Sequence, residues 1–296
     1  MNGRIRLLTY ACLAVGFSTP GVLNASVVTV PDSALVPSTT LYTNSFGNIV
    51  VMTGGGNAPG IGSPTGRNDD GFSGPTNLGF TLNFFGNNYT QFWIDNNGNI
   101  AFGNGISEFT PNGPQGATQP IISPFFADVD TRASTSGVVM LNTSIANEII
   151  VTWPAVGYFD SHADKTDTFQ LVLRGPDFNV PAGEGDVGFF YTTMQWEVGD
   201  ASGGTGGFCP AGTVGTSCFP AAVGFGDGQS NGFVLQNSTE NGISSIVNDT
   251  HIWFDLSSSG IPTPVTGTPE PSTVGLLLLG SASLFFVRRF FVRDKV

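Results

Sequence analysis

Residues 78–102 read LGFTLNFFGNNYTQFWIDNNGNIAF, and their pattern is the clearest indication of the fold class. Apolar and polar residues alternate over Leu78–Phe85. Two further apolar runs, Tyr89–Ile94 and Ile100–Phe102, flank the turn-forming sequence Asp95-Asn96-Asn97-Gly98-Asn99. Alternation with a period of two is typical of strands, and Asn and Gly tolerate the positive φ angles of tight turns. The stretch therefore predicts antiparallel strands joined by a hairpin.

The rest of the central chain repeats this pattern. Val138–Leu141 and Glu148–Trp153 predict a second hairpin around residues 143–147. Further short strands are predicted at Thr168–Arg174, Val187–Trp196, Ala222–Phe225, Phe233–Gln236 and His251–Leu256. The 41 Gly, 19 Pro and 25 Phe suit strands and turns, and no long stretch has the helical period. We expect an all-β, antiparallel, sandwich-like domain over residues 78–256.

The segments on either side of this domain differ in composition. Residues 26–77 are rich in Gly, Pro, Ser and Thr and contain one apolar stretch, Gly47–Thr53. Residues 257–268 are predicted to be a linker to the C-terminal tail.

Residues 269–296 consist of a short acidic motif between prolines, an apolar run and a basic end. The motif is Pro269-Glu270-Pro271, the apolar run is Thr273–Val287, and the basic cluster is Arg288, Arg289, Arg293 and Lys295. The run spans roughly 22 Å as a helix, against a hydrocarbon core of about 30 Å, and residues 290–292 can extend it. Basic residues after the run place that end in the cytoplasm. We expect a single transmembrane helix rather than a buried core helix, with the preceding chain outside.

This arrangement resembles the PEP-CTERM sorting tail of Gram-negative bacteria that export their own polysaccharide matrix. The resemblance implies that an exosortase-type membrane enzyme recognises Pro269, Glu270 and Pro271 and cleaves the tail. It also implies a precursor anchored in the inner membrane, followed by a destination in the periplasm, on the cell surface or in the extracellular matrix.

The N-terminus agrees with export. Arg4 and Arg6 are followed by a mostly apolar stretch, Leu7–Phe17, and by small and turn-forming residues up to Ala25. This order is typical of a secretory signal peptide, so we expect residues 1–25 to be removed by cleavage after Ala25.

The predicted exported part is strongly acidic. The whole chain has 10 Lys and Arg, 22 Asp and Glu, and a net charge of −12. Two of the basic residues lie in the predicted signal, and four basic residues and Asp294 lie in the tail, so residues 26–271 carry −17. Such a surface repels nucleic acid and anionic lipid and can attract divalent cations.

Several blocks within residues 78–256 follow one another in a characteristic order. They are Leu78–Gly86, the turn at 95–100, Ile121–Arg132, Phe169–Leu173, Gly188–Tyr191 with Trp196, and Ala222–Phe225. Together they resemble the NIDO domain, the extracellular module named for nidogen and found in adhesive matrix proteins. The resemblance implies an extracellular β-rich module linked to cell–matrix adhesion, without an established catalytic centre.

Cys209 and Cys218 are the only cysteines that remain after removal of the signal. They flank a short Gly- and Thr-rich loop in a chain bound for an oxidising compartment, which favours a disulfide. A metal site is the alternative, but the chain has only His162 and His251 as further soft ligands and no CxxC or HExxH motif.

Asp128 and Asp130 stand two apart in an apolar context, so on an extended strand they share one face. Three interpretations are open. The pair can organise the turn into Thr131-Arg132 with Arg132 as ion partner, hold Ca²⁺, or act as an acid–base pair. Residues 95–99 superficially resemble a calcium loop, but Gly98 comes too early and no Glu lies at the twelfth position, which favours the hairpin turn.

Catalytic motifs are otherwise weak. Asp160-Ser161-His162-Ala163-Asp164 contains the residue types of a hydrolase triad, but proximity in sequence does not make one, and no G-x-S-x-G elbow is present. Trp93, Trp153, Trp196 and Trp253 can stack on sugars if exposed, but each lies in a predicted strand, where core packing is commoner. We expect a non-enzymatic surface or matrix protein that adheres or associates with exopolysaccharide. A carbohydrate-binding module and a secreted hydrolase are the alternatives.

Overall fold

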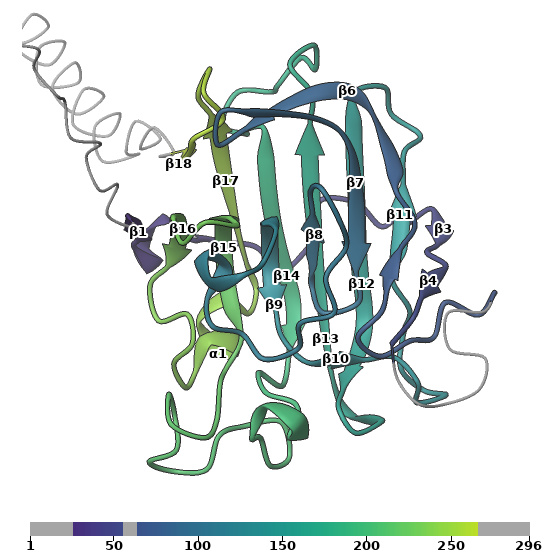
Figure 1. Ribbon diagram of the computed structural model, residues 1–296, viewed down its shortest axis with the longest axis vertical. Coiled ribbons are helices and arrows are strands. Elements are labelled where there is room, and N and C mark those ends of the chain that lie inside the picture. The colour runs from purple at the N-terminus through teal and green to yellow at the C-terminus, as the bar shows by residue number, and fades with distance from the viewer. Residues whose placement is uncertain (1–25, 56–63, 266–296) are drawn as a thin grey trace, which may run out of the picture.

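Two β-sheets make up the part of the chain that the computed structural model describes, residues 26–55 and 64–265 (Figure 1). The predicted signal peptide, sorting motif, transmembrane run and basic cluster lie outside these residues. Between residues 26 and 265, outside the gap at 56–63, no helix combines the length and apolar character needed to cross a membrane. The predicted all-β class is confirmed.

Sheet A has nine strands, eight of them in one continuous order. That order is β1 (Val27–Val30), β16 (Gly232–Leu235), β15 (Ala222–Asp227), β9 (Pro120–Phe126), β8 (Asn99–Ala101), β7 (Asn87–Asp95), β5 (Phe72–Ser73) and β4 (Met52–Thr53). The ninth strand, β6 (Thr76–Phe84), pairs with β7. All these pairings are antiparallel except β1 with β16, which is parallel.

Sheet B is antiparallel and also has nine strands. Its main order is β18 (Pro262–Pro264), β17 (Thr250–Leu256), β14 (Val187–Met194), β13 (His162–Arg174), β12 (Glu148–Tyr158), β11 (Met140–Asn142) and β3 (Asn48–Ile49). Two short strands join it at the side: β10 (Val129–Asp130) on β12, and β2 (Val36–Pro37) on β17. The one α-helix described is α1 (Ile243–Val247), and single 3-10 turns lie at Asp32–Ala34, Pro114–Gly116 and Asp200–Ser202.

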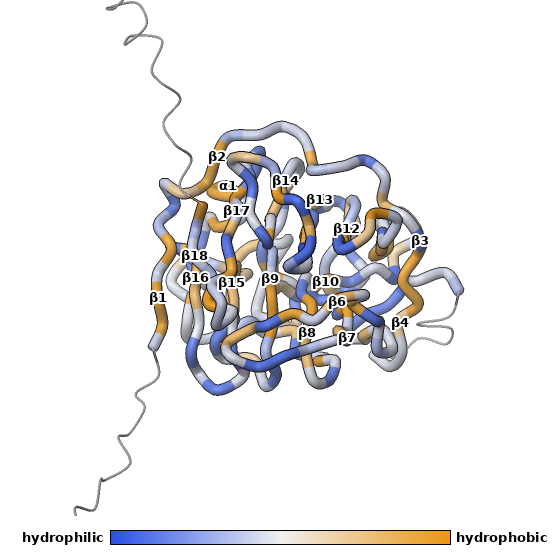
Figure 2. The backbone as a smooth tube through the Cα atoms, turned by 90° about the horizontal axis from the view of Figure 1, so that it is seen from above, coloured by the Kyte–Doolittle hydropathy of each residue, from blue (hydrophilic) through white to orange (hydrophobic). Residues whose placement is uncertain are grey.

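The core lies between the two sheets and is largely aromatic. In Figure 2, β7, β8 and β9 form one layer and β12, β13 and β14 the other. Phe125 of β9 contacts Phe169 of β13 with ring centroids 5.5 Å apart, and Phe225 of β15 stacks on Phe189 of β14 at 5.4 Å. All four rings are buried. Cross-sheet pairs of this kind join the layers into one sandwich.

Both predicted hairpins are confirmed. β7 and β8 pair on either side of the turn at 95–99, and β11 pairs with β12. Gly98 has φ +78°, and a Cβ there would lie 1.8 Å from the carbonyl oxygen of Phe125, so only glycine fits this turn.

The chain on either side of residues 78–256 takes part in the same sheets. Strands β1 to β5 come from residues 26–77, and β18 comes from residues 257–268. The apolar stretch Gly47–Thr53 divides between the layers, because β3 pairs with β11 in sheet B and β4 pairs with β5 in sheet A. Figure 1 shows β3 and β4 next to each other at one side of the molecule.

The outer face of sheet B carries a buried ion pair. The side chains of Arg174 and Glu148 are both 0% exposed, and Arg174 Nε donates to Glu148 Oε2 at 3.0 Å. Tyr42 O–H donates to the same carboxylate oxygen at 3.0 Å, and Arg174 also lies over the ring of Trp253 at 4.4 Å. Residues from the N-terminal segment thus cover this face of the sheet.

Asp167 in β13 is a fully buried carboxyl group on the opposite side of the same strand. Its Oδ1 accepts the backbone N–H groups of Gln195 at 2.6 Å and Trp196 at 3.1 Å, and burial raises its pKa well above the ordinary value. A raised pKa means that the folded state binds the proton more tightly than the unfolded chain, so this contribution to stability is complete below the ordinary pKa of Asp and is lost as pH rises toward the raised value.

We expect Asp167→Asn to reduce the dependence of stability on pH, because asparagine keeps a hydrogen-bond acceptor and carries no charge. Urea unfolding of both proteins at several pH values between 4 and 9 measures it. The wild type should lose stability relative to the variant as pH rises, and parallel profiles would contradict the assignment.

Candidate functional site

A loop before β5 is hydrogen-bonded to the end of β10, a side strand of sheet B. Asp69 and Asp130 form an isolated antiparallel bridge. The backbone N–H of Asn68 donates to Thr131 Oγ1 at 2.7 Å, and the N–H of Thr131 returns a hydrogen bond to the carbonyl of Asn68 at 2.9 Å. These contacts place the consecutive acids Asp69 and Asp70 beside residues 128–130.

The β7–β8 turn packs against both the 68–70 loop and β10. Asn96 and Asn97 are buried rather than solvated. Asn97 Oδ1 accepts the N–H of Val129 at 3.0 Å, while its Nδ2 donates to Asp70 Oδ1 at 2.9 Å. Asn96 Nδ2 donates to the carbonyls of Asn68 and Val129. The turn therefore fixes the relative positions of the 68–70 loop and β10.

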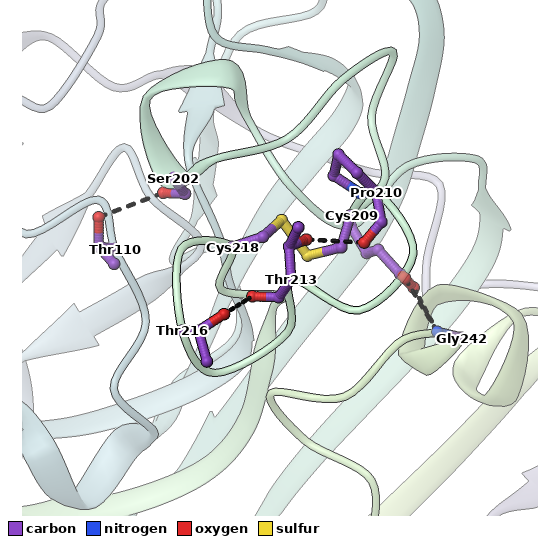
Figure 3. Close-up of a disulfide and its surroundings, with 9 residues drawn as sticks. Thr110, Ser202, Cys209, Pro210, Thr213, Thr216, Cys218 and Gly242 are labelled. Carbon is purple, nitrogen blue, oxygen red and sulfur yellow. Dashed lines mark hydrogen bonds between the residues drawn. A yellow bond between two sulfur atoms is a disulfide. The ribbon is translucent and has the colours of Figure 1, made fainter.

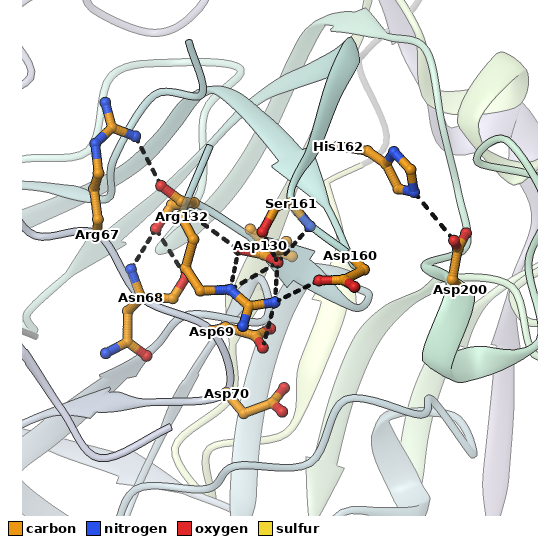
Figure 4. Close-up of polar contacts among 12 residues, drawn as sticks. Arg67, Asn68, Asp69, Asp70, Asp130, Arg132, Asp160, Ser161, His162 and Asp200 are labelled. Carbon is orange, nitrogen blue, oxygen red and sulfur yellow. Dashed lines mark hydrogen bonds and ion pairs between the residues drawn. The ribbon is translucent and has the colours of Figure 1, made fainter. Parts of the chain in front are cut away.

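Asp130 forms an ion pair with Arg132. The Nε of Arg132 donates to both carboxylate oxygens of Asp130 at 3.0 Å, and the backbone N–H of Ser161 donates to its Oδ2 at 2.8 Å (Figure 4). The same guanidinium reaches Asp69 Oδ2 at 3.1 Å and Asp160 Oδ1 at 3.3 Å. This geometry is that of the turn-organising interpretation, with Arg132 as the ion partner of Asp130.

Asp128 belongs to a different group. Its carboxylate, that of Asp69 and that of Asp70 offer one oxygen each, all within 4.8 Å of one another. Asp128 is 1% exposed and Asp69 2%. Among the described residues, neither oxygen of Asp128 has a hydrogen-bond partner, and Oδ1 of Asp69 has none either. The backbone of Gly199 packs on the Asp128 carboxylate so closely that a Cβ there would lie 2.4 Å from Oδ2.

The electrostatics of this group are unfavourable for three free negative charges. Burial, followed by the charges of Asp70, Asp69 and Asp130, raises the pKa of Asp128 to about 8, while the nearby backbone N–H of Ser202 acts in the opposite direction. Burial, then Asp70 and Asp130, raises the pKa of Asp69 to about 7 against the lowering effect of Arg132. Burial also raises the pKa of Asp70. The arrangement can therefore retain protons or hold a cation with oxygen ligands.

The polar residues of segment 160–164 contact different partners. Ser161 lies against Asp130 through its backbone N–H, and His162 Nε2 lies 3.1 Å from Asp200 Oδ2 at an exposed position. Asp164 Oδ1 accepts the O–H of Tyr158 at 2.9 Å. In the described part of the chain no hydrogen bond joins Ser161 to His162, so the segment does not form a nucleophile–base pair.

The predicted disulfide is confirmed. Cys209 and Cys218 are bonded, with their Cα atoms 5.6 Å apart (Figure 3). Within the loop, Thr213 Oγ1 donates to the carbonyl of Pro210 at 2.7 Å, and Thr216 Oγ1 donates to the carbonyl of Thr213 at 2.9 Å. Cys218 is fully buried, so the disulfide ties an exposed loop to the core.

Three of the four tryptophans are core residues, as expected. Trp153 and Trp196 are 0% exposed and donate their indole N–H groups to the carbonyls of Asn96 and Val156, both at 3.1 Å. Trp253 is also buried, and Trp93 is half-buried. Buried rings cannot stack on a sugar, so of the four tryptophans only Trp93 could do so.

Asp69 and Asp70 are the functional candidates that sequence reasoning missed. The available signal was Asn68-Asp69-Asp70-Gly71, two consecutive acids in a turn-forming context. Nothing in that stretch shows which distant segment it contacts, because a tertiary bridge and the buried turn at 96–97 determine its position.

Comparison with known proteins gives one consistent result. The sequence model of a family described as NIDO related matches residues 39–254. Alpha-tectorin of Gallus gallus is 29% identical over 161 residues, which cover 46% of this chain and 7% of that protein. Alpha-tectorin of Mus musculus is 30% identical over the same shares. Nidogen of Drosophila melanogaster is 28% identical over 149 residues, 41% of this chain and 11% of that protein. No solved structure matches the chain.

Proposed function

Because the chain belongs to the NIDO-related family, we propose that it is an exported, non-enzymatic protein of the cell surface or extracellular matrix that adheres through its two-sheet domain. The observation that carries the proposal is the extent of the family match, since residues 39–254 include strands of both sheets and nearly all of the core. The chain spans about a tenth or less of the length of nidogen and alpha-tectorin, so only the function of this module is proposed from them.

The geometry of the carboxylates supports a non-enzymatic role. Glycoside hydrolysis uses two carboxylates about 5–9.5 Å apart on either side of a substrate. Here Asp69, Asp70 and Asp128 form one cluster, and two of the three are almost fully buried, out of reach of a polymeric substrate. Asp130 is held by Arg132. Such a cluster suits structural or cation-linked roles better than hydrolysis.

Association with exopolysaccharide is the form of adhesion that the C-terminal sequence favours. The motif Pro269-Glu270-Pro271, the apolar run Thr273–Val287 and the basic residues after it support sorting by an exosortase-type enzyme in a cell that exports a polysaccharide matrix. We propose an inner-membrane precursor, released afterwards to the periplasm, cell surface or matrix. Retention of the exported protein on the producing cell's own matrix, with hydrolysis assayed in parallel, tests the adhesive function.

The sorting step has its own test. If Glu270 is read by the processing enzyme, Glu270→Ala should leave a longer precursor in the inner-membrane fraction, whereas the wild type appears shortened outside it. Glu240→Ala, a carboxylate on the described domain, is the matched control and should be processed normally. Unchanged processing and release of the Glu270 variant would leave the tail as an ordinary membrane anchor.

A further inference from the structure

Three carboxylates from two distant parts of the chain meet at the junction of the two sheets. Asp69 and Asp70 lie in the loop that is bridged to β10, and Asp128 lies between β9 of sheet A and β10 of sheet B. One oxygen from each lies within 4.8 Å of the other two. Two ligands on opposite sides of one Ca²⁺ ion, each at about 2.4 Å, would be separated by about this distance, so one ion can contact all three.

A second, independent observation is the state of Asp128. Asp128 is 1% exposed, yet among the described residues neither of its oxygens has a hydrogen-bond partner, and the nearby backbone N–H of Ser202 donates to the carbonyl of Gly199 at 3.1 Å instead. Buried carboxylates are normally paired, hydrogen-bonded or bound to a metal, because an unpaired buried polar atom is costly. Oδ1 of Asp69 is in the same state.

The nearby cation does not fill this role. Arg132 makes ion pairs with Asp130, Asp69 and Asp160, and Figure 4 shows these contacts and none from Arg132 to Asp70. No ion pair joins Arg132 to Asp70 or Asp128 in the described residues. Arg132 therefore contacts only Oδ2 of Asp69, and Oδ1 has no hydrogen-bond partner among the described residues.

We propose that Asp69, Asp70 and Asp128 form a calcium-binding site that joins the loop at 68–71 to the crossing between the sheets. All three ligands are carboxylates, so a hard cation is favoured over zinc or copper, which prefer nitrogen and sulfur. Calcium is favoured over magnesium because Mg²⁺ keeps several waters and uses only one or two carboxylates, whereas Ca²⁺ accepts several protein oxygens in irregular geometry.

The site explains two further features of the loop. Asp70 has φ +59°, an uncommon conformation for a residue other than glycine, and the hydrogen bond from Asn97 Nδ2 helps to hold its carboxylate in place. Gly199 lies against Asp128 where any side chain would displace the carboxylate. Both features fix ligand positions before a cation arrives, which is what a preorganised site needs.

Calorimetric titration of the full chain with CaCl₂, after removal of metal with a chelator, tests the proposal. We expect one ion per chain, weaker binding of Mg²⁺, and a melting temperature that rises with Ca²⁺ concentration because only the folded state presents the site. Absence of both the heat and the shift in melting temperature, or tighter binding of Mg²⁺ than of Ca²⁺, would overturn the proposal.

Two variants locate the ion. Asp70→Asn should weaken Ca²⁺ binding by about tenfold or more, since affinity follows the number of charged ligands. Asparagine tolerates the positive φ at this position and can keep an acceptor for Asn97, so the fold should survive. The matched control is Asp160→Asn, which removes an exposed carboxylate beside Arg132 outside the cluster and should leave the affinity within about threefold of the wild type. Equal losses in both variants would mean general electrostatic attraction rather than a site.

Discussion

Replacing Arg174 with methionine is expected to lower the free energy of unfolding by about 3–5 kcal/mol, because it leaves a buried carboxylate without its cation. The side chains of Arg174 and Glu148 are both 0% exposed and lie 3.0 Å apart. Arg174 also donates to the carbonyl of Gly185 at 3.0 Å and to the hydroxyl of Tyr42 at 3.0 Å. The change therefore removes a contact with the N-terminal segment through Tyr42 and one with the β13–β14 loop through Gly185, as well as the ion pairs with Glu148 and Glu184.

Chemical denaturation of the single and double variants measures this effect. Arg174→Met combined with Glu148→Leu should recover part of the loss, because the fully buried carboxylate is removed together with its cation and only the part-exposed Glu184 still lacks its ion partner. Lys165→Met, which removes an exposed ion pair with Asp164, is the matched control and should cost less than about 1 kcal/mol. If Arg174→Met were as stable as this control, the buried ion pair of Arg174 would not stabilise the fold as proposed.

Removal of the disulfide should cost about 2–3 kcal/mol of stability. The bond closes a loop between residues nine apart in sequence, and cross-linking such a short loop restricts the unfolded chain by an amount of this size. Cys209→Ala with Cys218→Ala avoids leaving a free thiol and avoids placing a hydroxyl at the fully buried position 218.

Unfolding with and without a reducing agent provides the control for the disulfide. The wild type should lose stability on reduction, whereas the double variant should not respond to the reductant at all. Equal stability of oxidised and reduced wild type would show that the bond does not hold the loop to the core.

The fold class could be predicted because strand and turn signals are local. The alternation at Leu78–Phe85 and the turn at 95–99 correspond to β6, β7 and β8. Sheet membership could not be predicted in the same way. The stretch at 47–53 contributes to both layers, and β1 joins sheet A by a parallel pairing with β16, about 200 residues away in sequence. These partners depend on tertiary contacts that no local pattern encodes.

The candidate site was predictable only in part, for a similar reason. Alternation along one strand would place Asp128 and Asp130 on the same face. In the structure the chain leaves β9 of sheet A at Phe126 and enters β10 of sheet B at Val129, so Asp128 lies at a crossing rather than within a strand. This change of sheet directs Asp130 to Arg132 and Asp128 to Asp69 and Asp70. The spacing of the two residues predicts that this segment carries a polar site, but the partners of each carboxylate follow from the crossing.

We propose that the two-sheet domain adheres to matrix and catalyses no reaction. The most direct test is saturable binding of the exported protein to matrix polysaccharide purified from the producing cell, with and without Ca²⁺, while glycan and peptide hydrolysis are followed in the same samples. We predict binding without hydrolysis, and for Asp128→Asn a lower calcium-linked stability with hydrolysis still absent. Absence of binding, or reproducible hydrolysis that Asp128→Asn abolishes at an unchanged melting temperature, would contradict the adhesive function and favour an enzyme.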